Sequence, residues 1–155
     1  MSLRKTKPLV WIFMGSESDR EALSPAAQTL EELGIPFRWE VASAHRAPRK
    51  LSRLILQAER EGAVVFIAAA GGAAHLPGVV ASQTRKPVIG IPMMTKTFKG
   101  IDSLLSILQM PGGVPVATMA VGPAGAKNAA ILAAEILALK YPRVRRALER
   151  LRPKK

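Results

Sequence analysis

Short apolar runs alternate with longer amphipathic segments along nearly the whole chain, and this alternation constrains the fold more than any other feature. The clearest runs are PLVWIFM at 8–14, AVVFIA at 63–68 and PVIGI at 87–91. A strand that is apolar at almost every position is typical of a parallel sheet, because such a sheet is buried on both faces. We therefore expect one α/β domain with a three-layer α/β/α arrangement, in which helices cover both faces of a parallel sheet.

Two further strands are expected at 37–42 and 114–121. The segments between the strands predict helices at about 18–33, 48–61, 76–84, 100–109, 126–139 and 142–151. The segment 48–61 is the clearest helix, since its apolar residues recur at helical spacing and Gly62 follows it. Pro25 lies inside the first helix, so this helix either kinks there or restarts with Ser24 as its N-cap.

The net charge of +12 first suggests a polyanionic partner, but most of it lies at the two ends of the chain. Residues 1–8 and 143–155 together carry nine of the twelve net positive charges. Aromatic residues make up only 5% of the chain and do not interleave with the basic runs, unlike in domains that stack bases. We therefore expect a single domain over 1–155, with a core of about 8–141 and a basic C-terminal helix or tail at 142–155, and the loops described below make it a candidate catalytic domain. A nucleotide- or nucleic-acid-binding module is the non-enzyme alternative.

The absence of cysteine excludes disulfides, thiolate zinc sites, iron–sulfur clusters and cysteine nucleophiles. No apolar run reaches the 18 residues that a transmembrane helix needs. The apolar run at 8–14 is followed by Gly-Ser-Glu-Ser-Asp rather than by a small-residue cleavage site, which favours a buried first strand over a signal peptide. A cytoplasmic protein is therefore expected.

In a parallel α/β sheet, ligands bind beyond the carboxyl ends of the strands, so the loops there should carry the chemistry. The loop after the first strand is GSESD at 15–19. Gly15 permits a tight turn, and serine hydroxyls beside free helix amides suit an anion. An ordinary helix cap at Ser18 or Asp19 is an equally good interpretation of this loop.

The loops after the second and third strands are SAHRAP at 43–48 and AAGGAAHLPG at 69–78. Arg46 is suited to a bidentate grip on phosphate, while His45 either transfers protons or is simply solvated. The small residues of the third loop let a ligand approach the backbone or let a helix pack closely on the sheet. This loop lacks GxGxxG, and His45 with His75 gives too few ligands for a metal site. Together the three loops suit a phosphorylated small molecule and proton transfer.

Six blocks of the sequence resemble the 5-(carboxyamino)imidazole ribonucleotide mutases of purine biosynthesis, the PurE family. They are MGSESD, SAHRAP, AAGGAAHLPG, PVIGIP, GIDSLLSILQMPGGVPVAT and NAAILAAEIL, and they span roughly residues 9–139. The resemblance implies a flavodoxin-like fold, a homo-octamer with sites close to subunit contacts, and a reaction without cofactor or metal. In that reaction the carboxylate moves from the exocyclic nitrogen of aminoimidazole ribonucleotide to ring carbon C4, through decarboxylation and recarboxylation.

The resemblance also implies a role for each residue of the matched motifs. His45 would be the general acid and base, and Asp19 would bind the ribose hydroxyls. The substrate phosphate would be held by Ser16, Ser18 and Arg46, with Ser43 nearby. The pocket over the imidazole and the released carbon dioxide would be formed by Gly71, Gly72, His75 and Leu76.

A sister class in the same family carboxylates aminoimidazole ribonucleotide directly with carbon dioxide, and this is the enzyme alternative. That class typically reads SAHK where this chain has SAHR, and it lacks the GGAAHLPG block. The sequence therefore resembles the mutase class. Its departures from the family pattern are Ala69, Pro25 and the basic end of the chain, none of them at a position with an implied catalytic role.

Overall fold

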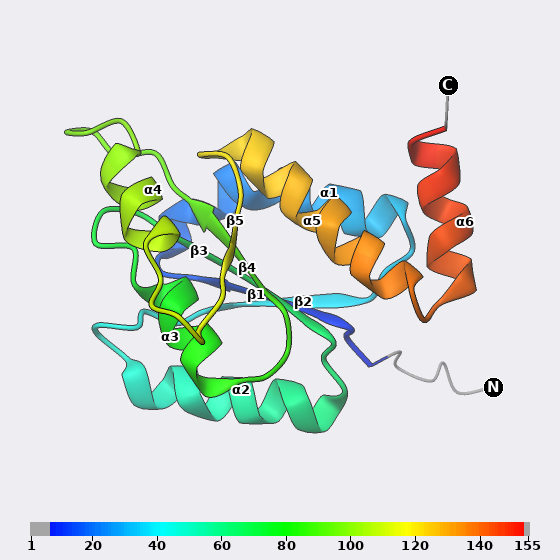
Figure 1. The fold of residues 1–155 in the computed structure, drawn as a ribbon, viewed down its shortest axis with the longest axis horizontal. Helices are drawn as coiled ribbons and strands as arrows, with labels where there is room; N and C mark the ends of the chain where they lie inside the picture. Colours follow the sequence, from blue (N-terminus) through cyan, green and yellow to red (C-terminus); the bar gives the residue numbers. More distant parts are fainter. Residues whose placement is uncertain (1–6, 154–155) are drawn as a thin grey trace.

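A computed structural model describes residues 7–153, which form a five-stranded parallel sheet between two layers of helices (Figure 1). The strands are β1 (Val10–Met14), β2 (Phe37–Val41), β3 (Val65–Ala70), β4 (Val88–Pro92) and β5 (Ala117–Thr118). They lie in the order β2-β1-β3-β4-β5, and every neighbouring pair is parallel. This order is the flavodoxin-like one, so the expected α/β/α fold is confirmed.

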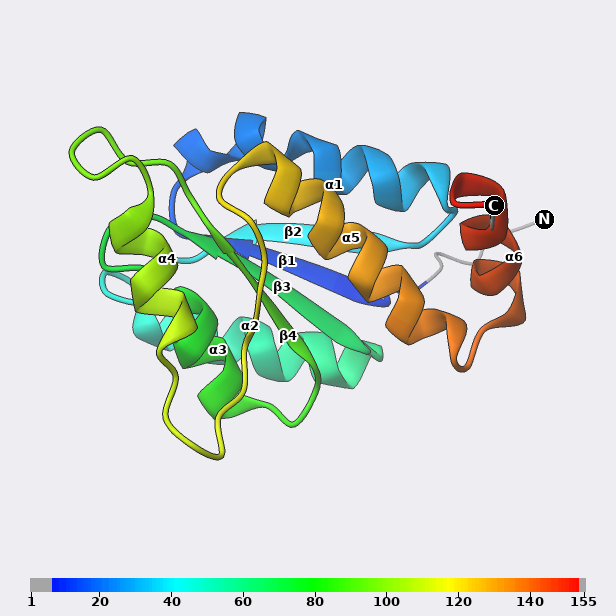
Figure 2. The same ribbon diagram turned by 45° about the horizontal axis from the view of Figure 1, so that its top comes forward.

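The helices divide between the two faces of the sheet. They are η1 (Glu17–Asp19), α1 (Arg20–Glu32), α2 (Pro48–Glu61), α3 (Leu76–Gln83), α4 (Ile101–Leu108), α5 (Pro123–Ala138) and α6 (Pro142–Leu151). Helices α1 and α5 lie on one face and α2 and α3 on the other, as both views show (Figure 1 and Figure 2). Successive side chains of β1 point to opposite faces of the sheet and so pack in both layers. Ile12 packs with α1 and α5, while Trp11 and Phe13 pack with α2.

The first helix contradicts one of the two sequence-based expectations about its proline. A short 3-10 turn, η1, comes first, and α1 then continues without interruption across Pro25. The expected restart with Ser24 as N-cap is therefore wrong. The hydroxyl of Thr29 donates to the carbonyl of Pro25 at 2.7 Å, which adds a side-chain hydrogen bond to the turn that follows the proline.

The fifth strand is much shorter than the expected 114–121 and pairs over only two residues, Ala117 and Thr118. Pro115 has no backbone N–H and so cannot donate to a sheet ladder. The chain stays close to β4 after the strand, since the amide of Met119 donates to the carbonyl of Gly90 at 2.9 Å. The prediction located this strand correctly and overestimated its length.

The basic end of the chain is partly built into the fold. Helix α6 packs against α5, and Val144 and Ala147 are buried in the same core cluster. Its arginines are exposed, and the guanidinium of Arg152 pairs with Glu135 of α5 at 2.6 Å. Residues 1–6 and 154–155, with part of the predicted basic ends, lie outside the described residues. Across 7–153, every helix is too short or too polar to cross a bilayer.

Candidate functional site

The parallel register brings the first three loops to one edge of the sheet. Met14, the last residue of β1, lies opposite Val41 on one side and Ala69 on the other. The three loops that follow therefore surround one cavity of about 420 Å³. Its lining is Gly15, Ser16, Asp19, Ser43, Ala44, His45, Arg46, Ala70, Gly71, Ala73, His75 and Leu76.

Eight of the ten residues singled out from the sequence line this cavity. Ser18 and Gly72 do not, although both lie in loops that do. The other four lining residues had no binding or catalytic role assigned from the sequence, namely Gly15, Ala44, Ala70 and Ala73. They carry little or no side chain, so sequence chemistry gives no direct signal for them beyond the small size that lets a ligand reach the backbone.

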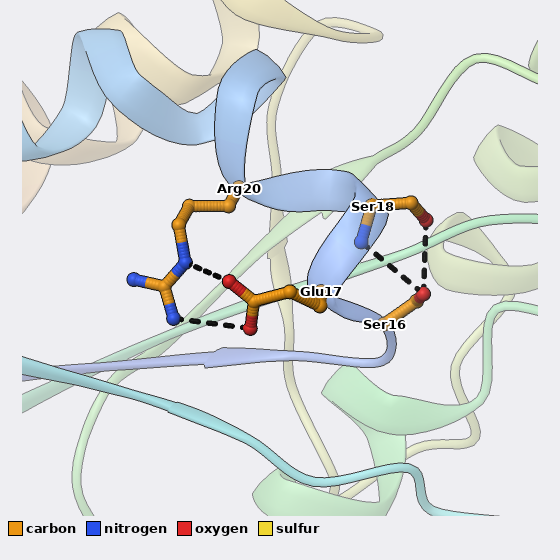
Figure 3. Close-up of polar contacts among 4 residues, drawn as sticks. All are labelled: Ser16, Glu17, Ser18 and Arg20. Carbon is orange, nitrogen blue, oxygen red and sulfur yellow. Dashed lines mark hydrogen bonds and ion pairs between the residues drawn. The ribbon is translucent and has the colours of Figure 1, made fainter.

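In the first loop, the hydroxyls of Ser16 and Ser18 lie together, while the exposed carboxylate of Glu17 points away from them toward Arg20 (Figure 3). The hydroxyls of Ser16 and Ser18 lie 2.9 Å apart, and Ser16 accepts a hydrogen bond from the Ser18 amide (Figure 3). Ser16, rather than Ser18, is thus the cap of the first turn. Glu17 instead pairs with Arg20, whose hydrogen bond holds the pKa of the Glu17 carboxyl below its usual value. The Glu17 charge is therefore matched by a cation next to the loop.

Asp19 is the acidic residue that lines the cavity. Burial raises the pKa of its carboxyl above the usual value, and a backbone hydrogen bond with Ser16 partly opposes that effect. It occupies the N-cap position of α1 but makes no side-chain capping bond there. Its oxygens are therefore not used by the helix that positions them.

The second and third loops bring the two histidines of the chain into contact. Nε2 of His45 lies 2.7 Å from Nδ1 of His75, and the rings meet edge to face with centroids 4.8 Å apart. One of these two nitrogens donates the hydrogen bond and the other accepts it. The tautomer of one ring therefore determines which nitrogen of the other ring can carry the proton. This contact joins residues 30 positions apart, and both side chains are exposed to the cavity.

The second loop also places a cation at the cavity. The amide of Arg46 donates to the hydroxyl of Ser43 at 3.2 Å, which fixes the turn that carries His45. Among the residues that the structure describes, no carboxylate forms an ion pair with the Arg46 guanidinium. The guanidinium is therefore available to an anionic ligand, for which its planar fork is well suited.

The glycine-rich third loop runs close to a helix that follows later in the chain. Gly72 has φ = +68°, in the left-handed region that favours glycine. Its backbone is held by two serines of α4, Ser103 and Ser106. Sequence reasoning missed both serines, because they lie 31 and 34 residues from Gly72 and carry no local pattern that marks them.

Among residues 7–153, no three His, Cys, Asp or Glu side chains are grouped so that they could hold a metal ion. Within the cavity the titratable groups are two histidines, one carboxyl and one guanidinium. This set can bind a phosphate, contact hydroxyls and exchange a proton with a ligand.

Comparison with known proteins identifies relatives over almost the whole chain. Residues 9–155 match the family model described as AIR carboxylase. The chain is 51% identical over 150 residues to an N5-carboxyaminoimidazole ribonucleotide mutase of Pyrococcus horikoshii, covering 97% of this chain and 84% of that protein. It is 54% identical over 142 residues to the mutase of Thermotoga maritima, covering 92% and 82% respectively.

Solved structures agree with these sequence relatives. The crystal structure of Treponema denticola PurE superposes with a TM-score of 0.84 at 29% sequence identity, covering 93% of this chain and 89% of that one. The similarity therefore extends over the sheet, the helices and the three loops that surround the cavity.

Proposed function

The chain belongs to the AIR carboxylase family as an N5-carboxyaminoimidazole ribonucleotide mutase of purine biosynthesis, and we propose that His45 carries the proton transfers of its reaction. The observation that supports this role most directly is the position of His45. His45 lies on the second loop, next to Arg46, and its ring lines the cavity and contacts His75 of the glycine-rich third loop. An imidazole in such a position can act as both acid and base near neutral pH.

In the proposed mechanism one proton is given and one is recovered. Protonated His45 donates to the exocyclic nitrogen of the substrate as the N–C bond to the carboxylate breaks and carbon dioxide leaves. Ring carbon C4 of the resulting aminoimidazole then attacks the carbon dioxide, forming the new C–C bond. His45, now neutral, removes the C4 proton and restores the aromatic ring. The imidazole ends in its starting state, so the cycle balances without an external acid or base.

The other cavity residues are proposed to bind and enclose the substrate. Arg46, with the hydroxyls of the first loop and Ser43, would hold the phosphate, and Asp19 would bind the ribose hydroxyls. The residues proposed to enclose the imidazole and the carbon dioxide are Gly71, Gly72, His75 and Leu76. Enclosure matters because free carbon dioxide would otherwise escape to water before C4 attacks it.

The experiment that tests the function is direct conversion. Purified protein mixed with 5-(carboxyamino)imidazole ribonucleotide should produce the C4-carboxylated isomer without ATP, biotin or added metal. Aminoimidazole ribonucleotide with bicarbonate serves as the second substrate and tests direct carboxylation. Faster carboxylation from bicarbonate than isomerisation would assign the chain to the alternative reaction, and neither reaction with folded protein would refute both.

Replacing Arg46 with alanine should raise KM about 10- to 100-fold, because a hydrogen bond to a charged group contributes about 1.5–3 kcal/mol. The effect on kcat should be smaller, since the phosphate lies away from the reacting atoms. Arg49→Ala is the matched control, because Arg49 is an exposed arginine of α2 that does not line the cavity. Steady-state kinetics would contradict the phosphate role if both variants had the same KM.

We further propose that the protein is a homo-oligomer, and an octamer as the resemblance implies. Helix α4 supports this proposal, because its Ile101, Leu105 and Leu108 side chains are 62%, 53% and 55% exposed at helical spacing. Light scattering should give about eight times the 16.6 kDa chain mass, and Leu105→Asp should lower it. A monomeric wild-type protein would contradict this proposal.

Two expectations from the sequence stay predictions. They are a cytoplasmic location and a reaction that needs neither cofactor nor metal. Dialysis of the protein against EDTA before the conversion assay tests the second, and unchanged turnover is the expected result.

A further inference from the structure

We propose that Ser103 is a positioning residue of the mutase, which holds the third loop in the conformation that presents Gly71 and His75 to the substrate. This inference rests on the proposed function, since it concerns the same cavity. It assigns a role to α4, a helix whose residues are absent from the cavity lining.

The hydroxyl of Ser103 joins the third loop to the segment after β4, two segments that the backbone hydrogen bond from the Met93 amide to the Ala70 carbonyl at 2.9 Å also connects. It donates to the carbonyl of Met93, just after β4, at 2.7 Å. It also accepts the amide of Gly72 at 2.9 Å. The side chain is completely buried, so water cannot replace either hydrogen bond. Ser103 therefore ties the third loop to the end of the neighbouring strand.

A second serine of α4 acts on the same glycine. The hydroxyl of Ser106 lies 3.2 Å from the carbonyl of Gly72 and 2.7 Å from the carbonyl of Asp102 in its own helix. The single O–H of Ser106 is shared between these two carbonyls and the Asp102 carbonyl is the nearer, so α4 holds the amide of Gly72 more firmly than its carbonyl. Since Gly72 is in the left-handed region, these contacts stabilise a backbone conformation that a free loop would leave easily.

The conformation of Gly72 determines how the groups on either side of it are placed at the cavity. Gly71, immediately before it, lines the cavity, and His75 follows through a tight turn in which Ala74 donates to the Gly72 carbonyl at 2.8 Å. His75 in turn contacts His45. A change at Gly72 would therefore move the imidazole pair as well as the backbone beside the substrate.

Burial of a hydroxyl does not by itself indicate such a role. Thr29 is the other buried polar residue in the part of the chain that the structure describes. Its hydroxyl donates only to Pro25, one turn earlier in the same helix. Ser103 instead reaches a loop 31 residues away. Thr29 is therefore a suitable control for loss of a buried hydroxyl without an effect on the site.

Loss of the Ser103 hydroxyl should affect the chemical step more than substrate binding. The phosphate ligands proposed above lie in the first two loops, which Ser103 does not contact. Misplacement of reacting groups by about 1 Å can cost about 100-fold in rate. We therefore expect Ser103→Ala to lower kcat about 10- to 100-fold while KM changes less than threefold.

The test compares Ser103→Ala, Ser103→Thr, Ser106→Ala and the control Thr29→Val by steady-state kinetics. Ser103→Thr keeps the hydroxyl and should recover most of kcat, while Ser106→Ala should lower kcat less than Ser103→Ala. Thr29→Val should keep the wild-type kcat. Equal kcat for Ser103→Ala and Thr29→Val, or a rise in KM alone, would overturn the proposal.

Hydrogen–deuterium exchange in the peptide that contains 71–75 provides a readout independent of activity. Exchange should be faster in Ser103→Ala than in the wild type and unchanged in Thr29→Val. If the wild type fails to convert the substrate, the proposed function fails, while this measurement still tests the contact. Unchanged exchange in Ser103→Ala would overturn the positioning role even in an active mutase, and it covers the case in which Ser103→Thr does not fit the core.

Discussion

His45→Asn is expected to lower kcat by about two to four orders of magnitude while the fold is kept. Asparagine retains a polar group that fills part of the same space, but it cannot give and take a proton as imidazole does. The loss corresponds to about 3–5 kcal/mol of transition-state stabilisation. Both proton transfers in the proposed mechanism depend on this ring, and the only other imidazole in the sequence, His75, is its hydrogen-bond partner.

Single-turnover kinetics, with the enzyme in excess of the substrate and at a concentration above KM, would measure this effect on the chemical step. Circular dichroism and light scattering should show wild-type secondary structure and mass. Substrate binding to His45→Asn, measured by calorimetry, should stay within about tenfold of the wild type, because the proposed phosphate ligands are unchanged. Near-normal turnover would show that His45 is not the acid and base, and His75 would then be the residue to test for that role.

The elements of the fold could be predicted where the deciding information is local. The helix at 48–61 was predicted with the bounds that the structure has, since Pro48 begins it and Gly62, with φ = +96°, ends it. The strands β1, β3 and β4 were recognisable because they are buried on both faces. The parallel sheet then placed the three loops at one edge, and eight of the ten predicted residues line the cavity there.

The features that could not be predicted depend on contacts between distant segments. The continuity of α1 across Pro25 is one, because packing of the helix on α5 outweighs the local preference against proline. The contact between His45 and His75 is another, since neither loop specifies the orientation of the other. The link from Ser103 to Gly72 has the same origin. Periodicity reports which face of an element is buried, but not which partner a buried polar group finds.

Gly125→Ala is expected to destabilise the protein by about 3 kcal/mol, although alanine is the better helix former. Gly125 is buried in the first turn of α5. A Cβ there would lie 1.7 Å from the carbonyl oxygen of Ala120 and 2.7 Å from its carbonyl carbon. Both are backbone atoms, so relief requires α5 or the segment after β5 to move. Helix propensity would favour alanine by only about 1 kcal/mol, so the steric effect decides the sign.

Thermal unfolding followed by circular dichroism should show a midpoint roughly 6–12 °C below that of the wild type for this loss. Gly112→Ala is the matched control, because an added Cβ there meets no atom within 4 Å and its φ lies outside the left-handed region. Its effect should stay within about 0.5 kcal/mol. A Gly125→Ala midpoint equal to or above the wild-type value would show that α5 can move away from Ala120 at little cost. The close approach of the first turn of α5 to Ala120 would then not explain why this buried position holds glycine.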